Sequence, residues 1–396
     1  MRHKFYSLSV ALVIFATVLG ISGFQAVFAK EQAHNPRKIV TFQENFLNSH
    51  TKDELIAKAG GVKIKDLDLI DGAAVYLPSK ASEKALAHEA GVLRVEDDAV
   101  AVALGKPRIT SQPAEVLPWG IDRIDAELSW GSTTGDPIKV AVVDTGIDLT
   151  HPDLAANIKG GINTINPQKS PNDDNGHGTH VAGTIGALDN TIGVIGVGPQ
   201  IDLYAVKVLG KNGSGFLSDV IEGLDWAVAN HMQVVNMSLG ASVDIQAFHD
   251  AVIRANSAGI VEVAAAGNSG GAVGFPAAYP EVIAVSATDT SNNIASFSSR
   301  GPEVDLAAPG VSIYSTYKGS TYRTLSGTSM ASPHVAGAAA LVLTTPVGAF
   351  DADSDGVWDP AEVQGKLEAR ATDLGTAGKD NLYGSGLVNA FSAISP

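Results

Sequence analysis

The chain has 396 residues, of which 45% are hydrophobic and 17% are charged, and it includes 42 glycines and 18 prolines. This composition is typical of a globular protein with many tight turns, and the length allows one large domain and a smaller one. The formal net charge of −15 excludes the basic surface of a nucleic-acid-binding protein. Because the chain has no cysteine, thiol chemistry is excluded, and core size or bound metal must supply the stability.

Residues 1–29 have the pattern of a secretory signal peptide. Arg2 and Lys4 give a positively charged start, and an apolar core follows over 8–21. Val27 and Ala29 then place small residues at the −3 and −1 positions of a cleavage site. We therefore predict cleavage before Lys30 and a secreted, extracellular protein. The alternative is a membrane anchor, but the apolar core is short for a spanning helix. No later segment has a comparable apolar run, so no membrane association is expected once the signal is removed.

Residues 30–104 form a separate region in which strand and helix patterns alternate. Thr51 and Glu54 have the spacing of a capping box, and Asp71-Gly72 is typical of a two-residue hairpin. The predicted order, β-α-β-β-α-β, is that of a small α+β ferredoxin-like domain, which alone does not decide a function. The expected strands are 38–42, 62–69, 73–77 and 92–95, and the expected helices are 51–59 and 79–90.

Small apolar residues at 99–104 precede a polar, proline-containing linker that runs to Pro118. Beyond the start of this linker, apolar strands alternate with helical patterns, which predicts an α/β domain over 105–396 with a mainly parallel central sheet flanked by helices. Ligands of such folds bind beyond the carboxyl ends of the strands. The expected strands are 139–143, 203–208, 234–237, 260–264 and 282–285, and the expected helices are 177–187, 218–230 and 244–258.

Three polar residues stand at the ends of such elements. Asp144 directly follows a buried strand, His177 lies in a glycine-rich turn that opens a helix, and Ser329 lies in a second turn into a helix. Each has an ordinary structural interpretation, since Asp and Ser often cap helices and a His in a glycine turn is often structural. Their joint occurrence favours catalysis, because a serine hydroxyl is a weak nucleophile that needs a base within hydrogen-bond distance.

Over about 105–396 the chain resembles the subtilisin-like serine proteases, whose triads have the chain order Asp, His, Ser. The segments around Asp144, His177 and Ser329 match that family almost residue for residue, as does the Ala-Ala-Ala-Gly-Asn segment that ends at Asn268. The resemblance implies a subtilisin-like fold and a serine endopeptidase.

The resemblance also gives each residue a role in an acyl-enzyme mechanism. His177 would take the proton of Ser329 and later deliver it to the leaving amine, and Asp144 would hold the imidazole in the correct tautomer. The start of the helix at Ser329 and the side chain of Asn268 would stabilise the oxyanion. His180 would be structural. Asn268 on its own has the ordinary interpretation of a turn residue after a strand.

Two short segments of small, uncharged residues match the family's first specificity pocket and the segments that pair with extended substrate backbone. We therefore predict polypeptide substrates, broad specificity and a preference for an apolar P1 residue. A carboxylate at Glu262, inside an apolar strand, departs from the family pattern, and the sequence does not indicate its partner. The expected substrate-binding residues are Ser238, Leu239, Gly240, Ala265, Ala266 and Gly267.

The segment 351–362 has the spacing of an EF-hand calcium loop, with carboxylates at positions 1, 3, 5, 9 and 12 and a glycine at the sharp turn. Calcium prefers many hard oxygen ligands, and the alternative is an exposed acidic loop. Because the chain has a single such loop, we expect it to fix the following helix rather than to act as a sensor. The expected ligands are the side chains of Asp351, Asp353, Asp355, Asp359 and Glu362 and the carbonyl oxygen of Val357.

The resemblance implies a second calcium site, the strong site of the family. Glu115 stands where the family commonly has Gln, which adds a negative charge. A weaker site at Glu303 and Asp305 is a further expectation. The expected ligands of the strong site are the side chains of Asp153 and Asn190 and the carbonyl oxygens of Leu188, Ile192 and Val194, with Glu115 beside them.

In the family, a ferredoxin-like domain assists folding and inhibits the enzyme with its tail, and the region 30–104 resembles this propeptide. The tail would end at Leu104 in the P1 pocket, with self-cleavage before Gly105. We expect a monomer whose partners are polypeptide substrates and its own propeptide. The rival interpretations are an inactive homologue that serves as a binding module and a calcium-dependent surface protein. The complete triad argues against the first, and the lack of adhesive repeats argues against the second.

Overall fold

The computed structural model describes residues 36–44, 47–103, 109–110 and 113–396. The predicted signal peptide and the predicted cleavage residues Leu104 and Gly105 lie outside these residues. The chain forms two compact units: the described parts of 1–65 with 74–98, and 66–73 with the described parts of 99–396. Among the described residues, no helix combines the length and apolar character needed to cross a bilayer.

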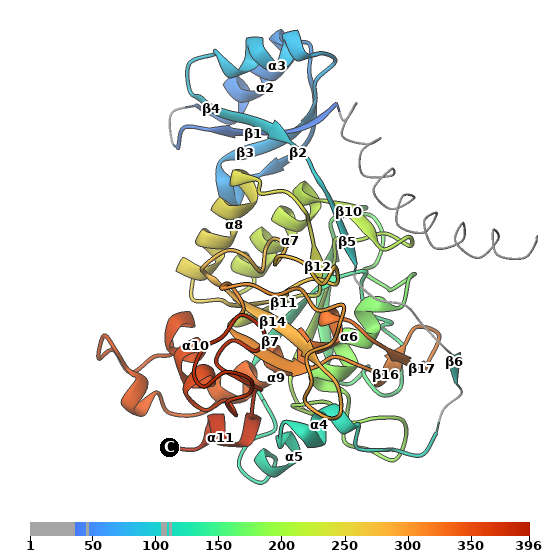
Figure 1. The fold of residues 1–396 in the computed structure, drawn as a ribbon. Helices are drawn as coiled ribbons and strands as arrows, with labels where there is room; N and C mark the ends of the chain where they lie inside the picture. Colours follow the sequence, from blue (N-terminus) through green and yellow to red (C-terminus); the bar gives the residue numbers. More distant parts are fainter. Residues whose placement is uncertain (1–35, 45–46, 104–108, 111–112) are drawn as a thin grey trace, which may run out of the picture. The chain divides into compact units, whose positions relative to one another are not determined.

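The first unit has the predicted β-α-β-β-α-β order (Figure 1). Its strand order, β2-β3-β1-β4, is ferredoxin-like. The capping prediction was wrong, because α2 begins after Asn48, whose side chain accepts the Thr51 N–H at 2.9 Å. The strand expected to reach residue 69 ends at Leu67, where a 3₁₀ turn begins. The elements of this unit are β1 (Arg37–Phe42), α2 (Ser49–Lys58), β2 (Val62–Leu67), β3 (Gly72–Tyr76), α3 (Lys80–Ala87) and β4 (Val92–Asp97). The short helix η1 (Asp68–Ile70), between β2 and β3, belongs to the second unit.

The second unit is built on a seven-stranded sheet of order β15-β14-β13-β11-β7-β9-β8, in which every neighbouring pair is parallel. This confirms the predicted parallel α/β fold. The central strands are mainly apolar and buried on both faces; residues 140–143 of β7, for example, are all 0% exposed. The edge strand β8 differs, because it carries an exposed lysine and two glycines. The strands are β7 (Lys139–Asp144), β8 (Ile158–Asn163), β9 (Asp202–Lys207), β11 (Val234–Met237), β13 (Val261–Ala265), β14 (Val282–Thr288) and β15 (Leu306–Pro309).

Helices cover this sheet, and α6 and α9 carry two of the predicted catalytic residues. Helix α9 packs against α6 and against strands β11, β13, β14 and β15, and it is buried along almost its whole length because its residues are small and apolar. The three helices predicted between the strands are present within two residues of their expected bounds. The helices are α4 (Trp119–Arg123), α5 (Ala126–Ser129), α6 (His177–Gly186), α7 (Leu217–Ala229), α8 (Gln246–Ser257), α9 (Thr328–Leu343), η2 (Gly348–Phe350), α10 (Pro360–Ala369) and α11 (Ala390–Ile394).

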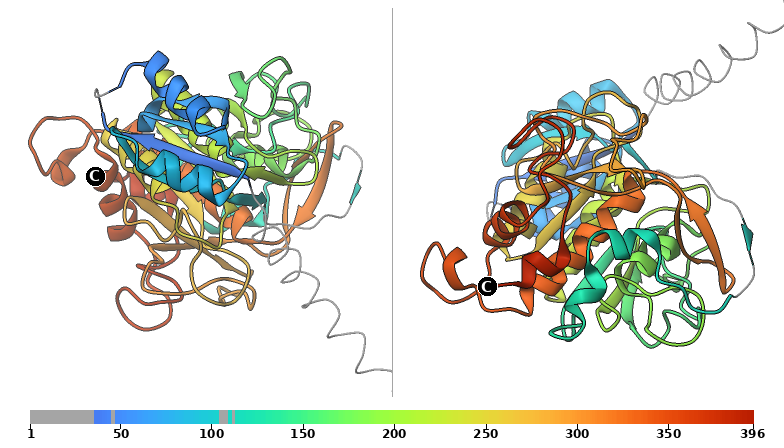
Figure 2. Two further views of the ribbon diagram at one scale, coloured as in Figure 1. Left: turned by 90° about the horizontal axis from the view of Figure 1, so that it is seen from above. Right: turned by 60° about the horizontal axis from the view of Figure 1, so that its bottom comes forward.

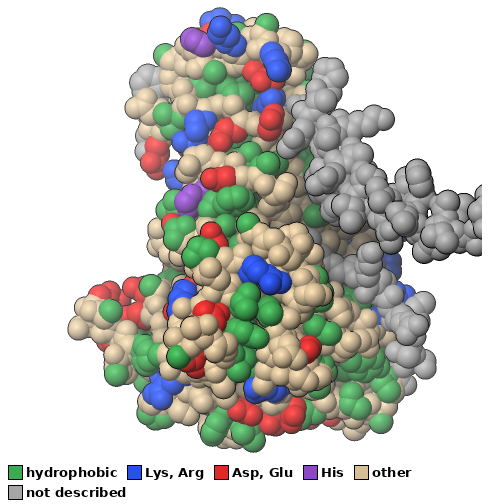
Figure 3. Space-filling model, in the orientation of Figure 1, with side chains coloured by type: hydrophobic (Ala, Val, Ile, Leu, Met, Phe, Trp, Pro, Cys, Tyr) green, Lys and Arg blue, Asp and Glu red, His purple; other side chains and the backbone are tan. Residues whose placement is uncertain are grey.

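Two small sheets lie beside the central one. In the first, β5 (Val100–Ala103) pairs antiparallel with β10 (Ser214–Phe216) on one edge and with β12 (Leu239–Gly240) on the other. In the second, β16 (Ile313–Tyr317) and β17 (Thr321–Leu325) form a hairpin that also pairs with β6 (Ile109–Thr110). The loop between η2 and α10 protrudes from the second unit (Figure 2), and acidic side chains gather at its tip (Figure 3).

Candidate active site

Asp144 and His177 form a buried hydrogen-bonded pair. Asp144 is the last residue of β7 and His177 is the first residue of α6, and they are 0% and 4% exposed. The imidazole Nδ1 lies 2.8 Å from Oδ1 and 2.9 Å from Oδ2 of Asp144. Oδ1 also accepts the Thr145 N–H at 2.6 Å. The carboxylate therefore fixes the orientation of the imidazole ring.

The close approach of α6 to the end of β7 depends on a glycine in the His-Gly-Thr-His motif. A Cβ atom at Gly178 would lie 2.2 Å from the Gly146 carbonyl oxygen and 3.1 Å from Asp144. The Gly178 N–H donates to the Thr145 hydroxyl at 2.9 Å. The motif thus keeps glycine next to His177 because any side chain would push the histidine away from its aspartate.

A second buried carboxylate, Asp173, joins the same two segments. Its Oδ1 accepts the Thr145 hydroxyl at 2.9 Å and the Gly176 N–H at 2.8 Å, and its Oδ2 accepts the Thr179 hydroxyl at 2.6 Å. Burial raises the pKa of Asp173, and these hydrogen bonds oppose the rise. The sequence analysis missed this residue, although an acidic pair in the turn ahead of His177 was a signal that could have found it.

Ser329 is the second residue of α9 and is fully buried. Its hydroxyl donates to the Ser238 carbonyl oxygen at 3.0 Å, and the Ser238 hydroxyl donates to the Ser329 carbonyl oxygen at 2.9 Å. These bonds fix Ser329 against the connection between β11 and β12. Because α6 and α9 pack against each other, the helices that begin at His177 and Thr328 are neighbours.

Asn268 lies beside the same turn. Its Oδ1 accepts the N–H and the hydroxyl of Thr328, each at 2.9 Å. This arrangement settles the orientation of the amide, since only the oxygen end accepts a backbone N–H. The NH₂ end therefore points away from Thr328, as a donor to a developing negative charge requires.

The predicted substrate-binding segments flank this turn. Ser238, the first residue of its segment, contacts Ser329, and the N–H of Gly267 donates to the Thr328 hydroxyl at 3.1 Å. Strand β5 pairs along one edge with β10 and along the other edge with β12, which contains Leu239 and Gly240 of the segment 238–240. Val102 of β5 lies opposite both Ser214 and Gly240. The second unit thus holds a short extended peptide next to the residues expected to bind substrate backbone.

The acidic loop brings three of its five predicted carboxylate ligands together. One ligand oxygen each from Asp351, Asp353 and Asp355 lies within 4.8 Å of the others. Asp359 and Glu362 fall outside this group and form a capping box at the start of α10. Burial makes the largest contribution to raising the pKa of Asp359, and the nearby Asp353 and Glu362 carboxylates raise this pKa further. Such crowding of hard oxygen ligands fits a divalent cation. The Val357 carbonyl belongs to a residue that is 63% exposed.

The residues expected at the second calcium site are also close together. Asp153 is fully buried, with Oδ1 accepting Asn190 Nδ2 at 2.6 Å and Oδ2 accepting the Val194 N–H at 2.9 Å. The Glu115 carboxylate accepts the Asn190 N–H at 2.6 Å, and the Leu188 carbonyl oxygen lies 3.5 Å from Asn190 Nδ2. Burial raises the pKa of Asp153 to about 6. Two carboxylates, an amide and carbonyl groups suit a hard cation.

The expected weak site is different. Asp305 Oδ1 accepts a hydrogen bond from the Lys379 ammonium at 2.7 Å, and Oδ2 accepts the Ala284 N–H at 2.9 Å. An ammonium group therefore already compensates this carboxylate, which leaves less need for a metal ion there than at the other two sites.

His180 and Glu262 are buried titratable residues that are not among the predicted catalytic residues. Burial lowers the pKa of His180 to about 3, and its Nε2 lies 3.1 Å from the carbonyl oxygens of Ile313 and Arg323, so it ties α6 to the β16–β17 hairpin. Glu262 pairs with Val235 and Val282 in the sheet. Among the described residues, its carboxyl oxygens have no hydrogen-bond partner, and burial raises its pKa well above the ordinary value.

Comparison with known proteins agrees with this geometry. The model of the subtilase family matches residues 135–386. The chain is 43% identical to Subtilisin E of Bacillus subtilis (strain 168) over an alignment that covers 99% of this chain and 100% of the relative. It is 51% identical to Subtilisin Savinase of Lederbergia lenta over an alignment that covers 71% of this chain and 99% of the relative. It is also 51% identical to the M-protease of Shouchella clausii (strain KSM-K16), with 71% of this chain and 70% of the relative covered. The chain therefore belongs to the subtilase family and is a subtilisin-like serine endopeptidase.

Proposed function

We propose that this subtilase is a secreted endopeptidase that cleaves polypeptides through an acyl-enzyme formed on Ser329. The observation that carries the assignment is the buried contact between His177 and Asp144, on a helix packed against the one that carries Ser329. His177 takes the hydroxyl proton as Ser329 attacks the scissile carbonyl carbon, and it returns the proton to the leaving amine. Water then hydrolyses the ester by the same route.

The oxyanion is stabilised by the side-chain amide of Asn268 and by the backbone N–H at the start of α9. In the present structure the Ser329 hydroxyl donates to Ser238, so we expect it to turn toward His177 when substrate fills the cleft. Hydrogen bonds of catalytic groups commonly tighten only in the complex.

We assign substrate binding to the segments 238–240 and 265–267, which carry no charged side chain. Small, uncharged walls favour an apolar P1 residue over a charged one, because a charge buried there has no partner. An extended substrate would pair with β12 and β10, in the manner that β5 does.

The experiment for this function uses the secreted protein and a casein substrate. A serine-directed fluorophosphonate should abolish hydrolysis and label Ser329, and Ser329→Ala should lose both hydrolysis and labelling. Hydrolysis by Ser329→Ala at the wild-type rate would overturn the assignment. Peptides that differ only at P1 should be cleaved in the order Leu or Phe before Asp or Lys.

We further propose that 30–104 is a propeptide that the enzyme removes by cleavage before Gly105. Support comes from the ferredoxin-like order of its elements and from β5, whose last residue, Ala103, precedes the expected P1 residue Leu104. Ser329→Ala expressed in a protease-free host should retain 30–104 after loss of the signal peptide 1–29. Normal maturation of that variant would exclude self-processing.

We also propose that calcium stabilises the enzyme. Asp351, Asp353 and Asp355 would hold one ion with the loop's remaining oxygens, and Asp153 with Asn190 would hold another. Bound calcium would cross-link chain segments and neutralise crowded carboxylates, and it has no part in the chemistry. A chelator should lower the thermal unfolding midpoint, and added calcium should restore it. An unchanged midpoint would contradict both sites.

A further inference from the structure

Lys207 is a buried lysine directly behind the proposed triad. It is the last residue of β9, and in the parallel register of the sheet it lies opposite Asp144 at the end of β7. The residue is 5% exposed. A buried ammonium is costly unless its donors are all satisfied, so its surroundings indicate what it does.

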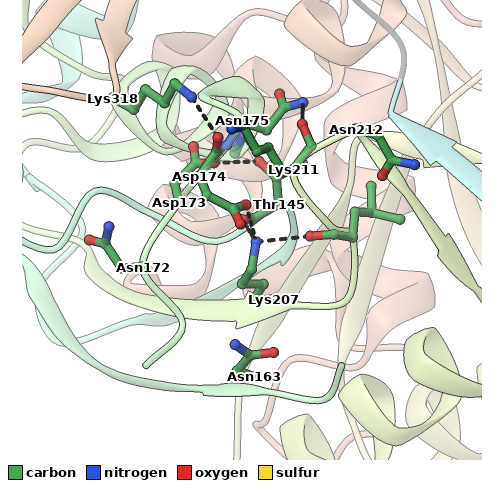
Figure 4. Close-up of polar contacts among 12 residues, drawn as sticks. Thr145, Asn163, Asn172, Asp173, Asp174, Asn175, Lys207, Lys211, Asn212 and Lys318 are labelled. Atoms are coloured by element: carbon green, nitrogen blue, oxygen red, sulfur yellow. Dashed lines mark hydrogen bonds and ion pairs between the residues drawn. The ribbon is translucent and has the colours of Figure 1, made fainter. Parts of the chain in front are cut away.

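The ammonium group has three hydrogen-bond acceptors, as many as it has donors (Figure 4). Nζ donates to the Thr145 carbonyl oxygen at 2.6 Å, to Asp174 Oδ1 at 2.7 Å and to the Leu209 carbonyl oxygen at 3.0 Å. Thr145 directly follows Asp144, Asp174 lies three residues before His177, and Leu209 follows β9. One cation therefore joins the segments that carry the two partners of the triad.

The Asp174 segment is also held from its other side. Lys318 Nζ donates to the Asp174 carbonyl oxygen at 2.5 Å, and the Tyr317 hydroxyl donates to the Asn175 carbonyl oxygen at 2.9 Å. The hairpin of β16 and β17 thus binds the turn at residues 174–175 on one side, and Lys207 binds the same turn on the other side. Asp173 accepts hydrogen bonds from uncharged hydroxyl and N–H donors of the same segments, so the cation in these connections is Lys207.

We propose that Lys207 and Asp174 act as a positioning pair that sets the geometry and the electrostatic field of the Asp144–His177 couple. This inference rests on the proposed triad. Neither residue touches substrate. The Asp174 side chain is about half exposed, whereas the Lys207 side chain is buried. The pair therefore consists of a buried cation and a counter-ion that solvent can reach. Removing one member leaves an uncompensated charge of known sign close to His177.

The sign of the charge makes the proposal testable. Lys207→Met leaves the Asp174 carboxylate alone, which favours the imidazolium, so the acidic limb of the kcat/KM–pH profile should move up by about 0.3–0.6 pH units. Asp174→Asn leaves the ammonium alone and should move the limb down by about the same amount. The double variant should return near the wild-type position. The other titratable or charged groups that face this region are Asp144, Asp173, His180, Lys211, Tyr317, Lys318 and Arg323.

Positioning should also appear in turnover. We expect Lys207→Met to lower kcat on the order of 10-fold with KM little changed, because the two triad segments lose a shared anchor. Lys207→Arg, which keeps the charge, should restore the position of the acidic limb. A matched control is Lys159→Met, which removes a lysine paired with Asp202 at the other end of β9, at 3.4 Å; its pH profile should match the wild type.

The outcomes separate this inference from the triad itself. Fluorophosphonate labelling of the wild type and each variant reports whether the nucleophile is active. If the wild type is not labelled, the triad assignment fails. If labelling is intact but the acidic limb stays fixed in both single variants, Lys207 and Asp174 are ordinary structural residues and the inference is wrong. Asp174→Asn changes a half-exposed side chain and should fold. Its pH profile therefore tests the inference even if Lys207→Met does not fold.

Discussion

The indole N–H of Trp358 donates to the carbonyl oxygen of Thr345 at 2.7 Å, with the Trp358 residue 8% exposed. Thr345 lies just after the last turn of α9, and Trp358 lies inside the acidic loop, between Val357 and Asp359. The loop is therefore tied to the end of α9, the helix that carries the proposed nucleophile Ser329 near its start. Trp358 also places an aromatic reporter within the proposed ion site.

Terbium, which binds calcium sites, should show emission sensitised by Trp358. Asp353→Asn should weaken this binding on the order of 10-fold, because the loop loses one of its clustered charges. The measurement is terbium luminescence during a calcium competition titration. Asp373→Asn, in a different exposed loop, is the control and should bind terbium as the wild type does. Equal binding by Asp353→Asn would show that the loop is only an acidic surface.

Replacement of Asn268 should affect turnover rather than substrate binding. Removing one side-chain donor from an oxyanion hole costs on the order of 10² to 10³ in kcat in subtilisin itself, and we expect a similar loss for Asn268→Ala. KM should change little, because the donor acts on charge that develops in the transition state. Steady-state kinetics with a peptide anilide provide the check, and a loss confined to KM would assign Asn268 to substrate binding instead.

The carboxylate at Glu115 should make stability depend more strongly on calcium. Glu115 accepts the Asn190 N–H and lies near Asp153, whose pKa is raised chiefly by burial and to a smaller degree by Glu115. With calcium, Glu115→Gln should unfold at a lower temperature than the wild type, because the ion loses a negative partner. With chelator, the variant should be as stable as the wild type or more so. Thermal scans in both conditions test this; parallel shifts would contradict it.

Glu262 should make the fold less stable as pH rises. Its folded-state pKa lies well above the unfolded value of 4.5, because burial penalises the charge. The folded state therefore keeps a proton that the unfolded state releases, and stability falls by up to about 1.4 kcal/mol per pH unit above pH 4.5, until the folded-state pKa is reached. Glu262→Gln removes this slope. Urea unfolding from pH 5 to 9 should show a gain over wild type that grows with pH.

Five of the seven parallel strands could be predicted because each is a local apolar run, as at 140–143. Strand β8, which carries a lysine and two glycines, and the four-residue strand β15 were not predicted, because neither has such a run rich in valine and isoleucine. Asp144, His177 and Ser329 were predicted as catalytic residues from motifs that the family shares, and the structure has the contact between Asp144 and His177.

The contacts of Lys207 could not be predicted, because these depend on the register between β7 and β9, whose paired residues are about 60 positions apart. The helix cap was missed for a local reason, since Asn48 and Thr51 are both good capping residues and only the chain path decides between them.

Ser329 stands at the start of a 16-residue helix that is buried along almost its whole length. The proposed nucleophile thus lies on a buried helix that packs against the central sheet of the second unit. Inactivation by heat should consequently coincide with cooperative unfolding of the whole second unit, which activity assays and thermal unfolding scans at the same temperatures would check.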